Sequence, residues 1–184
     1  MTIKNHKCVG LIIKNRSLSV VEVESKNGIP VVTNYSKILL EEGIVENDCI
    51  ILNKEGFQEA VKKLLADGVG GPISTSTLHV SLPEEKIFSH QITIFKEKVD
   101  DVEYIKEVAG DFIPIELSQA VFDYKAVHED PSGKTVTINF VATQDRIIQP
   151  ILETLKEIGL EVTTINVDIY CLIKSFHNSL NQGE

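Results

Sequence analysis

The chain has 184 residues, a formal net charge of −9 and 42% hydrophobic residues. This size and composition suit one globular domain or two small subdomains, and they argue against a disordered chain. Nucleic-acid binding and adsorption to an anionic membrane both need clustered Lys and Arg, and the sequence contains no such cluster.

The first part of the chain is predicted to form a β-meander followed by a helix. Apolar or valine-rich segments at 9–13, 18–24 and 30–40 indicate three strands, with the turn Lys26-Asn27-Gly28 between the last two. Asn53 is predicted to cap a helix over 54–66, whose apolar residues recur at the spacing of one buried face. A short strand is expected over 78–82, where Pro83 stops it.

The next stretch is predicted to form a separate unit, because its strands and helices follow their own order. Strands are expected over 87–95, 120–127 and 135–142, and helices over 99–112 and 144–158. We therefore expect a small βαββα subdomain over residues 83–159, inserted into a larger α/β subdomain of residues 1–82 and 160–184. A last strand at 161–167 and a helix at 169–180 are expected to return to the larger subdomain.

The number and spacing of the three cysteines indicate the cellular compartment of the protein. Cys8, Cys49 and Cys171 are far apart in sequence and form no CxxC pair, so neither a disulfide framework nor a zinc site is indicated. Each lies in an apolar run, and we expect three buried, reduced thiols in a cytoplasmic protein. The sequence has neither a signal-peptide pattern nor an apolar stretch of the roughly 20 residues that span a bilayer. A partner would therefore have to hold the protein at a membrane.

Five segments occur in the order found in a known family. They are VGLIIKNRSLSVVEVE, LLEEGIVEND, LHVSLPEEKIFSHQITI, DFIPIELSQAVFDYKAV and VATQDRIIQPILETLKEIGLEVTTINVD. The fourth is the most specific, with a helix end followed by a pattern IPxxLxxVxxDY. Together they resemble the type IV pilus assembly protein PilM family, kin to the division protein FtsA and the actin-like ATPases.

The resemblance implies an α/β fold: an actin-like (ribonuclease H-like) subdomain that carries an inserted small SHS2-type subdomain. In the family a second subdomain of comparable size follows the helix expected here at 169–180. The chain thus corresponds to the amino-terminal half, and we expect either a fragment or a natural half.

The opening hairpin departs from the phosphate-binding pattern GxDxGSSxxK of actin-like ATPases. In that pattern the Asp holds a hydrated metal, and the small residues let backbone amides approach phosphates. Five positions align with it: Gly10 and Ser17 match, while Ile12 replaces the Asp, Lys14 the second Gly and Ser19 the Lys. Isoleucine offers magnesium no oxygen ligand. The resemblance therefore implies a degenerate nucleotide site, without cofactor, metal or catalytic residues.

Two further features leave an enzymatic interpretation open. Lys14 and Arg16 could still bind phosphate, although exposed turn residues are the simpler interpretation. Asp168 follows a strand, where α/β folds often place functional groups, although a helix cap is the simpler interpretation. No spacing of His, Cys or carboxylate residues indicates a metal site or a catalytic site, so we expect a protein that is not an enzyme.

A partner-binding site is expected around Phe112-Ile113-Pro114-Ile115. Pro114 ends the preceding helix and forces Ile113 into an extended conformation, which either presents apolar side chains at the seam between the subdomains or packs them in the core. The resemblance favours the seam, because PilM proteins bind the cytoplasmic tail of the membrane protein PilN there. The expected partner-binding residues are Leu82, Pro83, Phe112, Ile113, Pro114 and Ile115.

The expected function is that of a scaffold or adaptor in type IV pilus assembly. Its expected partner is the tail of a PilN-like inner-membrane protein, with the pilus motor ATPases as further implied partners. It would be cytoplasmic and peripheral at the inner membrane, without inserting into it. Two alternatives remain: an actin-like ATPase fragment lacking its second subdomain, and the equivalent pseudo-actin scaffold of a type II secretion system.

Overall fold

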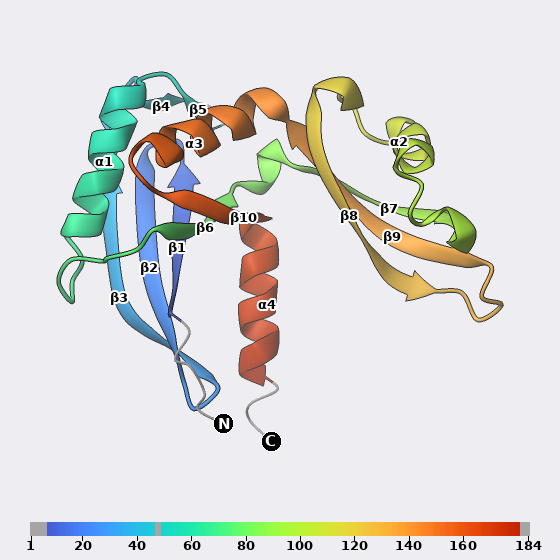
Figure 1. The fold of residues 1–184 in the computed structure, drawn as a ribbon, viewed down its shortest axis with the longest axis horizontal. Helices are drawn as coiled ribbons and strands as arrows, with labels where there is room; N and C mark the ends of the chain where they lie inside the picture. The colour runs from blue at the N-terminus through green and yellow to red at the C-terminus, as the bar shows by residue number, and fades with distance from the viewer. Residues whose placement is uncertain (1–6, 47–48, 181–184) are drawn as a thin grey trace. The chain divides into compact units, whose positions relative to one another are not determined.

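The computed structural model describes residues 7–46 and 49–180 (Figure 1). The chain divides into two units, which are described separately. Unit 1 comprises Met1–Glu84 and Gln149–Glu184, and unit 2 comprises Glu85–Ile148.

Unit 1 is built on a five-stranded sheet with the order β10-β6-β1-β2-β3. The meander is antiparallel, as predicted, whereas β6 runs parallel to both β1 and β10. The strands are β1 (Lys7–Lys14), β2 (Ser17–Lys26), β3 (Ile29–Leu39), β6 (Thr77–Leu82) and β10 (Glu161–Val167). A small pair, β4 (Val45–Glu46) and β5 (Ile50–Ile51), was not predicted.

One face of this sheet forms the core of unit 1. Burial alternates along β1 and β2, so that every second side chain is removed from water. Helix α1 (Lys54–Ala66) begins at Asn53, whose Oδ1 accepts a hydrogen bond from the Gly56 amide at 2.9 Å, as the sequence predicts. Buried side chains of the strands and of α1 include Leu11, Ile13, Leu18, Val20, Leu78, Val80, Phe57, Val61 and Leu64.

Helix α3 (Asp145–Glu157) belongs largely to unit 1, which differs from the expected boundary. The Gln58 amide of α1 donates to the Thr154 carbonyl at 3.4 Å and to Glu157 Oε2 at 2.9 Å, and Lys54 of α1 forms an ion pair with Glu157. These contacts join α3 to a helix about a hundred residues earlier. The expected subdomain ran to 159, whereas unit 2 ends at Ile148.

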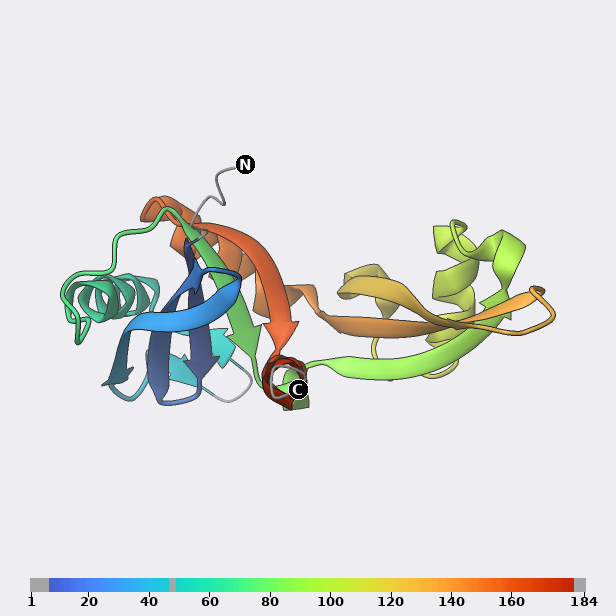
Figure 2. The same ribbon diagram turned by 90° about the horizontal axis from the view of Figure 1, so that it is seen from below.

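Unit 2 consists of a three-stranded antiparallel sheet with one helix, α2, on one face (Figure 2). The strands are β7 (Phe88–Phe95), β9 (Thr135–Gln144) and β8 (Ala120–Glu129), in the order β7-β9-β8. They form a sheet separate from that of unit 1, as predicted. Helix α2 (Val102–Gly110) begins at Asp101, whose carboxylate accepts from the Tyr104 amide at 3.1 Å. The SHS2 assignment of unit 2 stays a prediction.

The remaining elements are short 3-10 helices and the last helix. They are η2 (Glu84–Lys86), η3 (Lys96–Lys98), η4 (Leu117–Gln119) and α4 (Asp168–Leu180). Within residues 7–46 and 49–180, no helix is both long enough and apolar enough to cross a bilayer. Of the three cysteines, Cys49 is buried and Cys171 half-buried, but Cys8 is exposed at the start of β1, so the expectation of three buried thiols is wrong.

Candidate functional site

The segment predicted to be a degenerate phosphate loop lies on the β1–β2 hairpin of unit 1. Ile12 pairs with Ser19 and Lys14 with Ser17 in the antiparallel register, and Lys14 and Arg16 are exposed near the turn. A Cβ atom at Gly10 would lie 3.9 Å from the His79 carbonyl oxygen, an ordinary contact distance. The fold therefore does not need glycine at this position.

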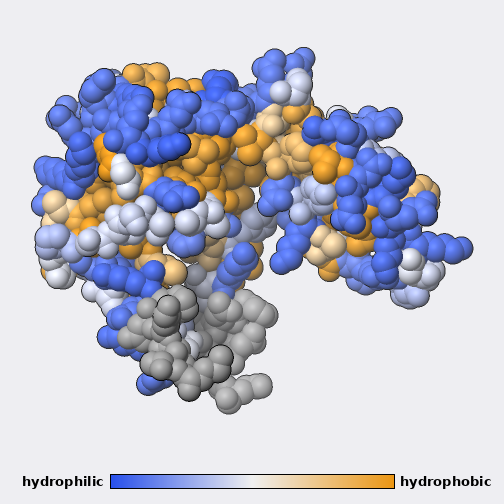
Figure 3. All heavy atoms as spheres, in the orientation of Figure 1, coloured by the Kyte–Doolittle hydropathy of each residue, from blue (hydrophilic) through white to orange (hydrophobic). Residues whose placement is uncertain are grey.

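A hollow of about 540 Å³ lies beside this loop, within unit 1. Gly10, Ile12 and Lys14 line it, together with residues of β2, β6, β10 and α4. The walls are mainly apolar, with contributions from Val21, Val23 and Leu172. Apolar side chains also gather over unit 1 in the space-filling view (Figure 3). Neither Ser17 nor Ser19 is among the lining residues.

Lys14 and Asp168, which line this hollow, carry opposite charges and lie close together. Lys14 Nζ lies 3.8 Å from Asp168 Oδ2, so its charge already faces a carboxylate. The other oxygen of Asp168 accepts from the amide of its neighbour Ile169 at 2.8 Å. Asp168 is the first residue of α4, where a carboxylate is favourable toward the helix dipole, and this bond is not the one to the second or third helical amide that a capping side chain makes. Within the described parts of the chain, no three His, Cys, Asp or Glu residues gather as a metal site would require.

The second predicted site, the segment from Phe112 to Ile115, follows α2 in unit 2. The amides of Phe112 and Ile113 both donate to the Ala109 carbonyl at 3.0 Å, which closes the helix end. Ile113 is only 5% exposed and packs in the core of unit 2. Phe112 is 52% exposed, and its ring stacks on His90 of β7 with the centroids 4.7 Å apart.

Two hollows flank this segment within unit 2. One, of about 630 Å³, is lined by Pro114, Ile115 and Glu116 and by Gln144, Asp145 and Arg146. The other, of about 880 Å³, is lined by α2 and again by Ile115 and Glu116. Ile115 and Glu116 therefore face both hollows. This arrangement offers an apolar anchor beside charges of both signs, which suits an extended peptide.

The six expected partner-binding residues divide by burial. Leu82, at the end of β6 in unit 1, and Ile113 are buried in the cores of their units, so their side chains present little surface. Pro83 and Ile115 are half-buried, and Phe112 and Pro114 are exposed. The role of all six in partner binding stays a prediction.

Sequence reasoning missed three residues at this segment: His90, Asp145 and Arg146. His90 lies between two other polar residues of β7, and nothing local marks it as the stacking partner of Phe112. Asp145 and Arg146 start α3, and only the folded chain brings them to the hollow beside Pro114.

Comparisons with known proteins give one matching family and several similar solved structures, including the two that follow. The sequence matches the family described as type IV pilus assembly protein PilM over residues 10–182. A comparison with curated proteins gives no significant match.

The first solved structure is a PilM-PilN type IV pilus biogenesis complex, with a TM-score of 0.74 and 18% identity over 89% of this chain. The second is the cytoplasmic domain of EpsL, an inner-membrane component of the type II secretion system of Vibrio cholerae, with a TM-score of 0.57 and 12% identity, also over 89% of this chain. At these identities the likeness concerns the fold. The matches cover 48% and 58% of those chains, so this chain spans about half of their length.

Proposed function

Because the chain belongs to the family of the type IV pilus assembly protein PilM, we propose that it is a binding module of a type IV pilus machine and not a nucleotide hydrolase. In this proposal it is a cytoplasmic scaffold that binds the tail of a PilN-like inner-membrane protein and is held at the membrane by it. The observation that carries the proposal is the family match, supported by the fold that the chain shares with the PilM-PilN complex.

The opening hairpin supports the absence of hydrolysis. Ile12 stands where a metal-binding carboxylate would be needed, and Lys14 faces Asp168 at 3.8 Å. An incoming phosphate would meet the negative charge of that carboxylate, and the apolar walls of the hollow offer few groups to replace its hydration. These features favour a binding role for the chain.

The accessible part of the segment from Phe112 to Ile115 is the proposed peptide site. Phe112 and Ile115 would supply apolar contacts to an extended tail. The larger hollow, which Ile115 lines, is also lined by five carboxylates and two lysines, a formal excess of three negative charges. Both lysines already form ion pairs, Lys98 with Asp101 and Lys106 with Glu103. A tail with apolar anchors and basic residues would therefore complement this surface.

A second candidate function is the equivalent scaffold of a type II secretion system, in which the partner tail would belong to that machine. The fold shared with the EpsL domain favours it. Contact with pilus motor ATPases is a further part of the first proposal, since a scaffold on the cytoplasmic side could join a membrane protein to its motor.

Calorimetric titration tests the proposal. The wild-type chain is titrated with the synthetic cytoplasmic tail of the PilN-like protein encoded in the same genome, and a scrambled peptide of the same composition serves as control. We expect saturable 1:1 binding of the native tail alone. Absence of saturable heat, with a chain that circular dichroism shows to be folded, would contradict the proposal. Binding of a type II secretion tail instead would favour the second candidate.

A further inference from the structure

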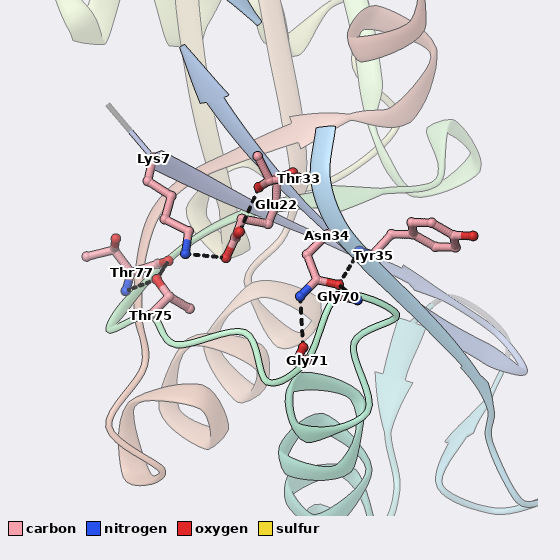
Figure 4. Close-up of polar contacts among 9 residues, drawn as sticks. All are labelled: Lys7, Glu22, Thr33, Asn34, Tyr35, Gly70, Gly71, Thr75 and Thr77. Carbon is pink, nitrogen blue, oxygen red and sulfur yellow. Dashed lines mark hydrogen bonds and ion pairs between the residues drawn. The ribbon is translucent and has the colours of Figure 1, made fainter. Parts of the chain in front are cut away.

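The two sheets differ in how their outer strands are protected. An outer strand presents unpaired backbone groups, which can pair with another chain unless something covers them. On β3, one of the two edges of the unit 1 sheet, a loop lies over the strand: the Val69 amide donates to the Tyr35 carbonyl at 3.0 Å. Asn34 holds this loop by accepting from the Gly70 amide and donating to the Gly71 carbonyl, each at 2.8 Å (Figure 4).

Strand β8, an edge of the unit 2 sheet, has no such cover. It is ten residues long and pairs with β9 on one side. Within residues 7–46 and 49–180, no backbone hydrogen bond joins β8 to a further strand or loop on its other side. Its exposed residues include Val121, Asp123 and Lys125. The strand is thus a long edge with accessible backbone groups.

One of these groups can be assigned to the open side. The Tyr124 amide donates to the carboxylate of its neighbour Asp123 at 2.8 Å, and so is not donated to β9. In an antiparallel strand the amide and carbonyl of one residue point to the same side, and successive residues alternate. Phe122, Tyr124 and Ala126 therefore direct their backbone groups to the free edge, where an incoming strand would find them.

The side chains of β8 select one register for pairing with a second copy. Two identical antiparallel strands that extend one sheet are related by a twofold axis, which passes through a pair of identical residues. An axis at residue 123 places Asp opposite Asp, and an axis at residue 125 places Lys opposite Lys. An axis at Tyr124 places Asp123 of each copy opposite Lys125 of the other, on the exposed face of the sheet.

We propose that two copies of this chain associate through β8, paired antiparallel about Tyr124 to give a continuous six-stranded sheet. Tyr124 of each copy would exchange both backbone hydrogen bonds with Tyr124 of the other, and Asp123 would turn from the Tyr124 amide to Lys125 of the second copy. The bulge between Ala126 and His128 ends the regular strand and limits pairing to the segment before it. Charge complementarity indicates that a second copy of this chain is the partner of β8. Of the registers centred on residues 123, 124 and 125, the one centred on Tyr124 places opposite charges across from each other.

A charge exchange tests the pairing by sedimentation equilibrium of the full chain. Asp123→Lys and Lys125→Asp each place like charges opposite one another twice in the dimer. Each variant should therefore raise the Kd of the dimer by roughly tenfold or more. An equimolar mixture of the two variants restores both opposite-charge pairs between unlike chains, and so does the double variant Asp123→Lys/Lys125→Asp. Glu107→Lys on the exposed surface of α2 makes the same change in net charge as Asp123→Lys and should leave the dimer unchanged.

The expected result is a wild-type dimer that both single variants weaken and that the mixture restores, with hydrogen exchange showing protected β8 amides. Three results would overturn the proposal: a wild-type chain that stays monomeric at millimolar concentration, a dimer indifferent to both single variants, or single variants that do not complement each other. A monomer whose β8 amides become protected when the PilN-like tail peptide is added would assign this edge to that peptide instead.

Discussion

Replacing Asn34 should release the loop that covers the edge of the unit 1 sheet. Its side chain is 6% exposed and makes three hydrogen bonds, to the amides of Tyr35 and Gly70 and to the carbonyl of Gly71. Asn34→Ala removes all three. The bonds to Gly70 and Gly71 join the strand to the loop, whereas the bond to Tyr35 lies within β3. At about 1 kcal/mol for each of the two bridging bonds, local opening of the loop becomes easier by about 2 kcal/mol, which corresponds to roughly 30-fold faster exchange of the loop amides.

Hydrogen exchange followed by mass spectrometry measures this opening in the peptide that contains Val69 and Gly70. Asn34→Asp keeps the two accepting interactions and loses the donation to Gly71, so its effect should be smaller. Asn166→Ala on β10 makes the same truncation elsewhere in the sheet and should leave the loop unchanged. Exchange of the Gly70 amide that accelerates less than threefold in Asn34→Ala would refute the assignment of Asn34 as the anchor of the loop.

Three further predictions concern pH, the core and nucleotide. The Lys7 ammonium, and then the Thr33 hydroxyl, hold the pKa of the buried Glu22 carboxyl below its ordinary value, against the opposing effect of burial (Figure 4). Glu22 therefore stabilises the fold at pH values above its ordinary pKa, and this contribution is lost as the pH falls through the lowered value. The free energy of unfolding, measured with urea, should fall less steeply with decreasing pH in Glu22→Gln than in the wild type. An equal pH dependence in both proteins would contradict this role of Glu22. Ile113→Ala should lower the free energy of unfolding of unit 2 by about 2–5 kcal/mol, as measured by hydrogen exchange of the β9 amides. Ile115→Ala, at a half-buried position, is the control and should have a smaller effect. Equal effects of the two variants would contradict the role of Ile113 in the core. Calorimetric titration with Mg-ATP should give no saturable heat, because Ile12 offers the metal no ligand. A magnesium-dependent signal at micromolar concentration would contradict the prediction that the nucleotide site is degenerate.

Most elements of the fold were predictable because their signals are local. Asn53 and the apolar spacing that follows it determine where α1 begins and which face it buries, and the structure agrees at both ends of the helix. The meander likewise follows from short apolar segments and the Asn27-Gly28 turn, where both residues have positive φ. The resemblance to the PilM family was confirmed by the match over residues 10–182.

The features that escaped prediction depend on contacts between distant residues. Helix α3, which lies largely in unit 1, contacts Gln58 and Lys54 of α1, about a hundred residues before Thr154 and Glu157. Periodicity shows that α3 has an apolar face but not which sheet that face will cover. The β4–β5 pair escaped because its strands are two residues each, too short to show alternation.

The proposed peptide site shows the same limit at single residues. Phe112 and Ile113 are adjacent and both apolar, and composition cannot tell which one faces water. In the structure Ile113 joins the core of unit 2, and Phe112 stays 52% exposed against His90. The choice is made by the helix end at Ala109, whose carbonyl accepts from both amides, and by the sheet against which α2 packs.

The most direct test compares two exposed phenylalanines of unit 2 in their effect on partner binding. Phe112 is 52% exposed at the proposed peptide site, and Phe95 is 58% exposed at the end of β7. Each is replaced by Ala, and the Kd for the PilN-like tail peptide is measured by calorimetry. We predict that Phe112→Ala weakens binding by roughly tenfold or more, as loss of an interface anchor does, while Phe95→Ala binds as the wild type. Wild-type affinity in Phe112→Ala, with the variant folded, would contradict the placement of the partner site at this segment.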